Sequence, residues 1–310
     1  MPALPQSNNI QTDITEAKVV KMTLNDFFSA IFGISQLLFV VTSMLAMGLS
    51  LSVQQMTQPL KNIRLVILAL LANFVLVPLL GLAIIMIIPL DQSLQIGVIL
   101  LATAAGAPFI PKLVQGAKGN LAYAVGLMFL IMVVTIFYLP IILPVLIPST
   151  EVNPWDIAKS LIVTMLIPLV IGMLIKSHSP DVADDWAPVM QKISSLSILI
   201  LLVVGLGLNI SNIIGFIGTR GFGALIILIA GALLIGSVFG GRDPGVRSAM
   251  GLSTANRNGA AAILVATQNF SGTNTLPFVL VGTVLMLLIL LPVAKRMGAS
   301  KETTVSEPAA

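Results

Sequence analysis

The residues best suited to bind an ion or a charged solute lie in one otherwise apolar stretch, 251-GLSTANRNGAAAILVAT-267. Its middle holds Ser253, Thr254, Asn256, Arg257 and Asn258. A charged side chain at the centre of a membrane span costs about 2.5–3.5 kcal/mol on insertion scales, so it normally faces protein or a watery cavity. The sequence therefore predicts a buried polar site around this arginine.

Three roles are open to Arg257. Its guanidinium could receive the anionic group of a solute, replace a coupling cation, or bind backbone carbonyls that a broken helix leaves free. The asparagines on either side supply more polar capacity than a purely structural arginine requires, which favours one of the first two roles. Asn256 and Asn258 could instead cap half-helices, for which asparagine is well suited.

A second disturbed stretch is 104-AAGAPFIPKL-113. Pro108 and Pro111 each remove a backbone donor and clash with the preceding turn, and Gly106 belongs to the same predicted helix break. In the first stretch the weak point is the step from Asn258 to Gly259. The N-termini of two opposed half-helices would point partial positive charge at the middle of the membrane, which favours a carboxylate or a sulfate.

Two further residues are weaker candidates for the site. Lys112, at the end of the break in 104–113, is either a site residue or a loop lysine whose ammonium reaches the membrane interface. Asn73, inside 70-LLANFVLVPLLG-81, is a single amide in an apolar run, and such an amide more often makes an interhelical hydrogen bond than binds a ligand.

The composition indicates the elements that hold these residues. The 310 residues are 57% hydrophobic and 9% charged, which is far from a soluble domain. We therefore predict an all-α polytopic membrane protein with one membrane domain over 27–296 and solvated ends at 1–26 and 297–310. Nine apolar runs fall at 31–51, 63–88, 94–112, 121–147, 157–175, 193–210, 222–239, 247–267 and 276–293.

Several function classes lack support in the sequence. It contains no Walker A, HExxH or GxSxG motif and no convincing acid pair, so we expect neither an enzyme nor a bound cofactor. The absence of cysteine excludes disulfides and thiolate metal sites. The net charge of +4 is ordinary for loops that signal topology and gives no sign of nucleic-acid binding.

The loop cations predict the orientation. Ten lysines and arginines follow the first, third, fifth and seventh runs or lie at the C-terminal end, whereas four lie on the other side. The ten are Lys61, Arg64, Lys118, Lys176, Lys192, Arg242, Arg247, Lys295, Arg296 and Lys301, and the four are Lys18, Lys21, Lys159 and Arg220. Cytoplasmic loops carry the excess, so we expect the N-terminus outside and the C-terminus in the cytoplasm, in a plasma or inner membrane.

A short similarity between two parts of the sequence suggests an internal repeat. The first run ends 47-MGLSLS-52 and the sixth ends 206-LGLNIS-211, a similarity short enough to arise by chance. If the match is a true repeat, runs 1–4 correspond to runs 6–9, and the odd offset of five makes the two copies cross the membrane in opposite directions. The disturbed runs 3 and 8 then fall in register, as at the midplane site of an inverted-repeat transporter.

The run that begins at Asn73, Asn-Phe-Val-Leu-Val-Pro-Leu-Leu, together with 253-STANRNGAAA-262, resembles the bile acid:sodium symporter family over nearly the whole chain. The resemblance implies a panel domain of spans 1, 5 and 6 and a core domain of spans 2, 3, 4, 7, 8 and 9. It also implies that the two discontinuous helices of the core cross.

The sequence departs from the family where sodium would bind. The resemblance places the span 8 Glu and Gln of sodium-coupled members on Ser253 and Arg257, and retains the Asn as Asn258. The span 3 Ser-Asn pair falls on Ile110 and Pro111, the span 4 Ser and Thr fall on Ala124 and Met128, and the span 2 Gln falls on Asn73. Because sodium needs a cage of oxygen ligands, these sodium sites are degenerate. We hypothesise that Lys112 and Arg257 occupy the sodium positions.

The leading functional expectation is a secondary transporter that moves a small organic anion, bearing a carboxylate or sulfate, across the lipid bilayer by alternating access with weakened or absent sodium coupling. The alternative within transport is sodium symport, in which backbone carbonyls and Asn73, Ser253, Thr254 and Asn258 hold the ion. The alternative of another class is a membrane receptor or assembly protein that transports nothing, although a scaffold has no need of costly buried cations at paired breaks.

Overall fold

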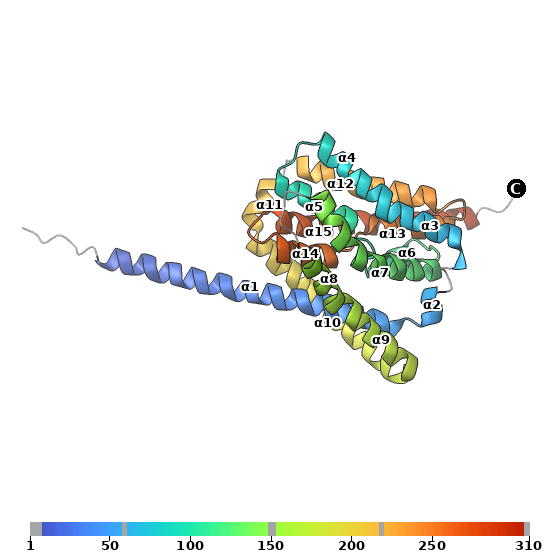
Figure 1. Ribbon diagram of the computed structural model, residues 1–310, viewed down its shortest axis with the longest axis horizontal. Helices are drawn as coiled ribbons and strands as arrows, with labels where there is room; N and C mark the ends of the chain where they lie inside the picture. The colour runs from blue at the N-terminus through green and yellow to red at the C-terminus, as the bar shows by residue number, and fades with distance from the viewer. Residues whose placement is uncertain (1–7, 58–60, 148–152, 217–219, 307–310) are drawn as a thin grey trace, which may run out of the picture.

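The structure is a computed structural model that describes residues 8–57, 61–147, 153–216 and 220–306, and every regular element in these ranges is helical (Figure 1). The elements are α1 Asn8–Ser50, α2 Val53–Thr57, α3 Ile63–Leu71, the π-helix η2 Ala72–Leu76, α4 Val77–Ile87, α5 Gln92–Thr103, α6 Ile110–Gly116, α7 Leu121–Leu146, α8 Pro154–Leu161, the π-helix η3 Ile162–Leu166, α9 Ile167–His178, α10 Pro180–Leu208, α11 Ile210–Phe216, α12 Arg220–Phe239, α13 Pro244–Ala255, α14 Gly259–Asn269 and α15 Thr275–Ser306.

Seven helical segments of the described chain are long and apolar enough to cross a membrane. They are Leu24–Ser50, Ile63–Ile87, Leu121–Leu146, Pro154–His178, Pro180–Leu208, Arg220–Phe239 and Thr275–Ala299. They coincide with the predicted runs 1, 2, 4, 5, 6, 7 and 9. Runs 3 and 8 are instead each divided into two shorter helices, α5 with α6 and α13 with α14, as their proline and glycine residues predict. The chain is an integral, multi-pass membrane protein.

Helix ends differ from the ends of the apolar runs. Helix α1 passes from the predicted N-terminal segment into the first run without a break, and α15 continues to Ser306 through part of the predicted tail. Helix α10 begins at Pro180, well before the apolar run at 193. Its first turns carry exposed acids such as Asp184 and Asp185, so they are helical without being apolar. Hydropathy locates contact with the bilayer, whereas a helix can continue into water.

Helices α1, α9 and α10 pack against one another and form a group of their own (Figure 1). The crossing of α1 and α9 depends on Gly48 and Gly172, since a Cβ on Gly172 would lie 2.6 Å from the Leu45 carbonyl oxygen and 2.9 Å from the Gly48 Cα. Membrane helices gain little from hydrophobic burial against each other, so small residues that allow close packing supply much of the attraction. We call α1, α8, η3, α9 and α10 the three-span group.

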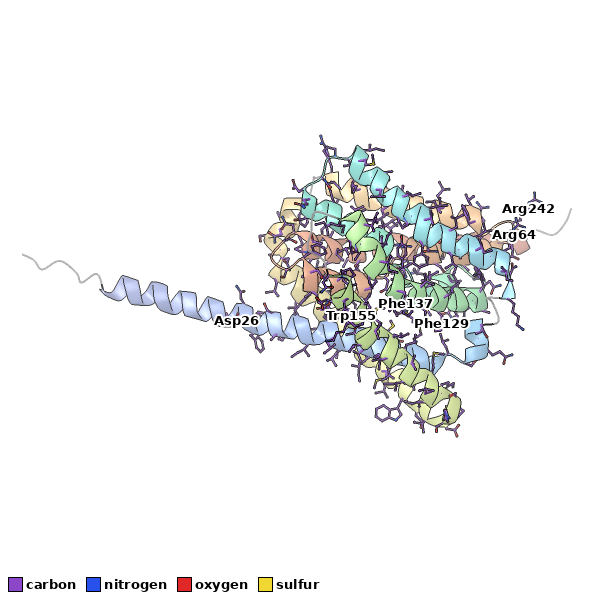
Figure 2. All side chains as sticks on the ribbon, viewed as in Figure 1. Asp26, Arg64, Phe129, Phe137, Trp155 and Arg242 are labelled. Carbon is purple, nitrogen blue, oxygen red and sulfur yellow. The ribbon has the colours of Figure 1, made fainter. Side chains whose placement is uncertain are left out.

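The other spans pack around the two divided helices. Helix α12 lies against α13 and α4, and α15 lies against α5 and α14. Contacts between this larger group and the three-span group are made by α7, α11, α14 and α15. Arg64 at the start of α3 and Arg242 after α12 lie at the same end of the molecule (Figure 2). Both helix breaks lie in the interior of this larger group, because α4, α7, α12 and α15 pack around the divided spans.

Candidate functional site

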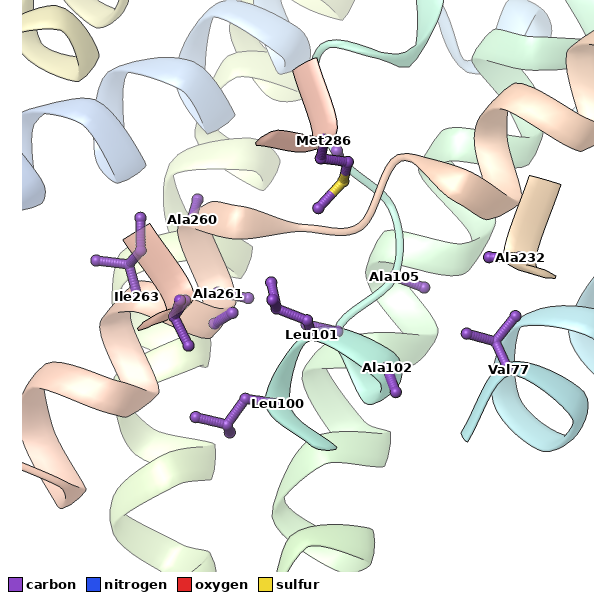
Figure 3. Packing of buried hydrophobic residues seen from close by; sticks show 14 of the residues in the cluster. Val77, Leu100, Leu101, Ala102, Ala105, Ala232, Ala260, Ala261, Ile263 and Met286 are labelled. Atoms are coloured by element: carbon purple, nitrogen blue, oxygen red, sulfur yellow. The ribbon is translucent and has the colours of Figure 1, made fainter. Parts of the chain in front are cut away.

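The breaks in the two divided spans lie directly against each other in the protein interior (Figure 3). The first break separates Thr103, the end of α5, from Ile110, the start of α6, and the second separates Ala255 from Gly259. The backbone N–H of Asn258 donates to the Ala104 carbonyl at 2.9 Å, so the two extended segments share a main-chain hydrogen bond. Two spans far apart in sequence therefore meet where neither is helical.

Local residues explain the shape of the first break. Gly106 adopts φ +80°, a conformation that favours glycine, and it packs on the backbone of Met132 in α7 where a Cβ would collide. The buried hydroxyl of Thr135 accepts from Ala105 N–H and lies 3.1 Å from the Ala105 carbonyl oxygen. Pro111 lies in the first turn of α6 rather than inside the break, where its missing N–H has no cost. The break is thus held from α7 by two contacts that its own sequence does not reveal.

Arg257 fills the space between the breaks. Its side chain is among the largest that are fully buried, at 2% exposure, and its guanidinium makes five hydrogen bonds. The Nε donates to the Leu101 carbonyl at 3.0 Å and an Nη donates to the Ala102 carbonyl at 2.7 Å. The remaining acceptors are the Asn73 side-chain oxygen at 2.8 Å, the Thr254 carbonyl at 3.1 Å and the Asn73 carbonyl at 3.4 Å. All five N–H groups are thereby engaged.

This arrangement includes the third of the roles that the sequence left open, the binding of carbonyls at a broken helix, and it leaves the second, the replacement of a coupling cation, open. Leu101 and Ala102 lie in the last turn of α5, where backbone carbonyls lack helical partners and the helix dipole is negative. A cation placed there satisfies the carbonyls and offsets the dipole together. No guanidinium N–H remains for a solute in this structure, so the buried arginine acts as an internal connector.

Asn73 reaches the arginine because its own helix is irregular. It lies in the π-helix η2, which ends at Leu76, two residues before Pro78 in α4. Since a proline at 78 has no N–H to give to the Phe74 carbonyl, that oxygen needs another donor, and Tyr138 Oη supplies it at 2.8 Å. The Asn73 amide donates to the Thr254 hydroxyl at 3.3 Å and its oxygen accepts from Arg257. The predicted interhelical hydrogen bond of Asn73 is confirmed.

Asn258 joins both breaks and begins the next half-helix. Its side-chain oxygen accepts from the Ala261 N–H at 3.1 Å as the N-cap of α14, and its amide donates to the Gly106 carbonyl at 3.1 Å. Gly259 follows as the first residue of α14, where a Cβ would meet the Thr283 side chain. The capping role considered for Asn258 is confirmed, whereas Asn256 ends α13 through its backbone.

Two polar atoms of the site have no protein partner. The Ser253 hydroxyl and the Asn256 amide nitrogen are buried and make no hydrogen bond to any residue that the structure describes. Ser253 lies in the last turn of α13 and Asn256, three residues further on, is the C-cap of this helix, so the two side chains start from neighbouring positions at the helix end. Buried groups of this kind are usually satisfied by water or an ion.

Lys112 does not join the other candidates. Its side chain is exposed on α6, and its ammonium lies 5.5 Å from the centroid of the Phe109 ring. The expectation that it occupies a buried sodium position at the crossover is therefore wrong, because α6 turns this residue away from the interior. The hypothesis of a built-in cation now rests on Arg257 alone.

Residues that the sequence analysis missed also shape the site. Thr135 and Tyr138 in α7 hold the first break and η2 respectively, and the Met286 sulfur in α15 accepts from the backbone N–H of Arg257 at 2.9 Å. Between the two helix groups, the Gln36 amide of α1 donates to the Thr267 hydroxyl of α14 at 3.2 Å. Isolated polar side chains within long apolar runs were the available signal, and only Asn73 was identified by it.

The chain was compared with known proteins. Residues 37–216, more than half of the chain, match the Sodium Bile acid symporter family. A relative in Arabidopsis thaliana, named probable sodium/metabolite cotransporter BASS3, chloroplastic, is 23% identical over 244 residues, which cover 76% of this chain. The aligned region amounts to 56% of that relative, so the chain spans little more than half of its length. By this match over more than half of its length, the chain belongs to the Sodium Bile acid symporter family.

Proposed function

We propose that this protein is a secondary transporter that moves an organic anion bearing a carboxylate or sulfate by alternating access. The family is one of transporters rather than enzymes, which supports the general class. We assign the three-span group as the panel domain and the larger group with its crossed breaks as the core domain. The N-terminus faces outward in this proposal, and the core moves against the panel around the crossover.

Arg257 replaces the coupling ion in this proposal. The observation that carries it is the guanidinium at the last turn of α5, which occupies the Leu101 and Ala102 carbonyls together with both oxygens of Asn73. A sodium ion at the crossover would need such oxygens as ligands. Because the guanidinium of Arg257 already holds these four oxygens, they are not available as ligands for a sodium ion at the crossover. Transport in this proposal therefore proceeds without sodium.

Sodium-coupled transport is the second candidate. The name of the family and that of the Arabidopsis relative both refer to sodium. The unpartnered Ser253 hydroxyl supplies one buried oxygen near the crossover that Arg257 leaves free. An ion held there would need further oxygens, from the α13 backbone and the Asn256 amide in its flipped orientation.

Uptake into proteoliposomes separates the two candidates. The purified chain is reconstituted, and uptake of a panel of radiolabelled mono- and dicarboxylates and sulfonates is measured with sodium outside and then with choline in its place. Equal rates support the arginine-substituted carrier, whereas a steep dependence on sodium establishes the second candidate. A folded protein that moves none of the anions in either medium contradicts both and favours the receptor class.

A further inference from the structure

A hollow of about 460 Å³ lies away from the crossover, between α11, the first turn of α12 and the N-terminus of α5. Arg220, Ser211, Asn212, Asn274 and Asp91 supply its polar lining. By the loop charges, the helix ends that line it lie on the side that we propose faces outward. Its volume is in the range of sites that bind small organic molecules.

The arginine of this hollow is unpaired. Arg220 has no hydrogen bond or ion pair with any described residue, and it forms none with Asp91, although both line the same space. Ser211, Asn212 and Asn274 likewise have no side-chain hydrogen bond within the described parts of the chain. A guanidinium fork beside free hydroxyl and amide donors suits a carboxylate or sulfonate, which accepts two parallel hydrogen bonds.

A second hollow of about 520 Å³ shares Arg220 and Pro89 with the first. Its remaining lining is apolar, namely Ile87, Ile88 and Gly223. Ile87 at the end of α4 is 79% exposed, so this apolar wall is open rather than covered by the protein. The guanidinium therefore lies between a polar and an apolar space, which matches a molecule with a charged head and an apolar body.

We propose that the two hollows form a binding site for a monovalent amphipathic anion, with its carboxylate or sulfonate head at Arg220 and its apolar part along Ile87 and Ile88. The carboxylate of Asp91 repels a second negative charge, which favours one charge on the head. This site deepens the proposed function and rests on it only for the step in which the captured anion is a transported solute. The anion comes either from the water phase or from an anionic lipid of the same leaflet.

Labelling of an introduced cysteine tests the charge preference, because the natural chain has none. In Ser211→Cys, rates of reaction with an anionic and a cationic methanethiosulfonate reagent are measured in phosphatidylcholine vesicles. We expect the ratio of the anionic to the cationic rate to fall about fivefold or more when Arg220→Gln is added, since a nearby unit charge acts on the two reagents in opposite directions. Arg242→Gln, at the other end of α12, is the matched control and should leave the ratio unchanged. A ratio unaffected by Arg220→Gln overturns the proposal.

Protection from labelling tests binding itself. Naphthalene-2-sulfonate should slow the labelling of Ser211→Cys, and Arg220→Gln should abolish this protection. Slower labelling in vesicles that contain phosphatidylglycerol, without added sulfonate, identifies lipid as the source of the anion. If neither the sulfonate nor the lipid slows labelling, the site does not bind such anions. If Ser211→Cys takes up anions but neither the sulfonate nor the lipid protects its cysteine, the proposed site is wrong and the proposed transport stands. If its cysteine is protected but the protein takes up no anion, the proposed transport is wrong and the site stands.

Discussion

The guanidinium of Arg257 lies 2.8 Å from the side-chain oxygen of Asn73, although 184 residues separate them in the sequence. Through this bond a π-helix in the second span is tied to the break in the eighth. The same guanidinium also holds the last turn of α5, so three spans are joined by a single side chain.

Removal of the Asn73 amide should destabilise the fold. In Asn73→Ala the buried guanidinium loses its side-chain acceptor and the Thr254 hydroxyl loses its donor, which should cost about 2–3 kcal/mol in the free energy of unfolding. Unfolding by SDS in mixed micelles measures the change. Asn269→Ala is the control, since among the described residues this half-buried amide donates only to the Val265 carbonyl in its own helix, and its cost should stay below about 1 kcal/mol. Equal costs for the two variants would show that the connector role of Arg257 is unimportant for stability.

Restoration of the residues that the family resemblance implies should create sodium dependence. The double variant Ser253→Glu/Arg257→Gln removes the fixed cation, frees the Leu101 and Ala102 carbonyls and adds a carboxylate. A bound ion stabilises the folded state by mass action, so we expect the melting temperature of the double variant to rise with sodium but not with choline. Arg257→Gln alone is the comparison and should respond less. A wild-type protein with the larger sodium response would contradict the replacement of the ion by Arg257.

The Tyr138 hydroxyl should stabilise the π-helix before Pro78. Tyr138→Phe leaves the Phe74 carbonyl without a partner and should cost about 1–2 kcal/mol. Pro78→Ala provides an N–H four residues after Phe74, so it should recover part of this loss in the Tyr138→Phe background. The unfolding free energies of the wild type, the two single variants and the double variant form a double-mutant cycle, and strictly additive effects would argue against a shared carbonyl.

The close crossing of α1 and α9 predicts a sharp difference between two glycines. Gly172→Ala inserts a methyl group against the Leu45 carbonyl and Gly48 and should destabilise by about 1–3 kcal/mol. Gly33→Ala in α1 has no atom within 4 Å of the new Cβ, and it should be neutral or stabilise, because alanine favours a helix over glycine. Thermal unfolding of the two variants in the same detergent makes the comparison, and similar melting temperatures would contradict tight packing at Gly172.

The helix breaks could be predicted because proline and glycine act through the local backbone. Pro108 and Gly259 mark their spans without knowledge of any partner. The acceptors of Arg257 could not be predicted, since four of the five are backbone carbonyls, three of them in other spans, and a carbonyl is the same in every residue. Lys112 was misplaced for a related reason. The sequence placed it beside the break, but the orientation of α6 decides whether it points inward, and this follows from packing.

The buried Arg257 has a thermodynamic consequence for a carrier that works without a moving cation. Each monovalent anion that crosses would carry one uncompensated negative charge through the membrane potential, about 2.3 kcal/mol for every 100 mV. With a negative interior this energy favours export, and at 100 mV it corresponds to a concentration ratio of roughly 50 at equilibrium. A carrier driven by sodium entry would accumulate its anion inside the cell, whereas a carrier with only a fixed cation would favour export of the anion.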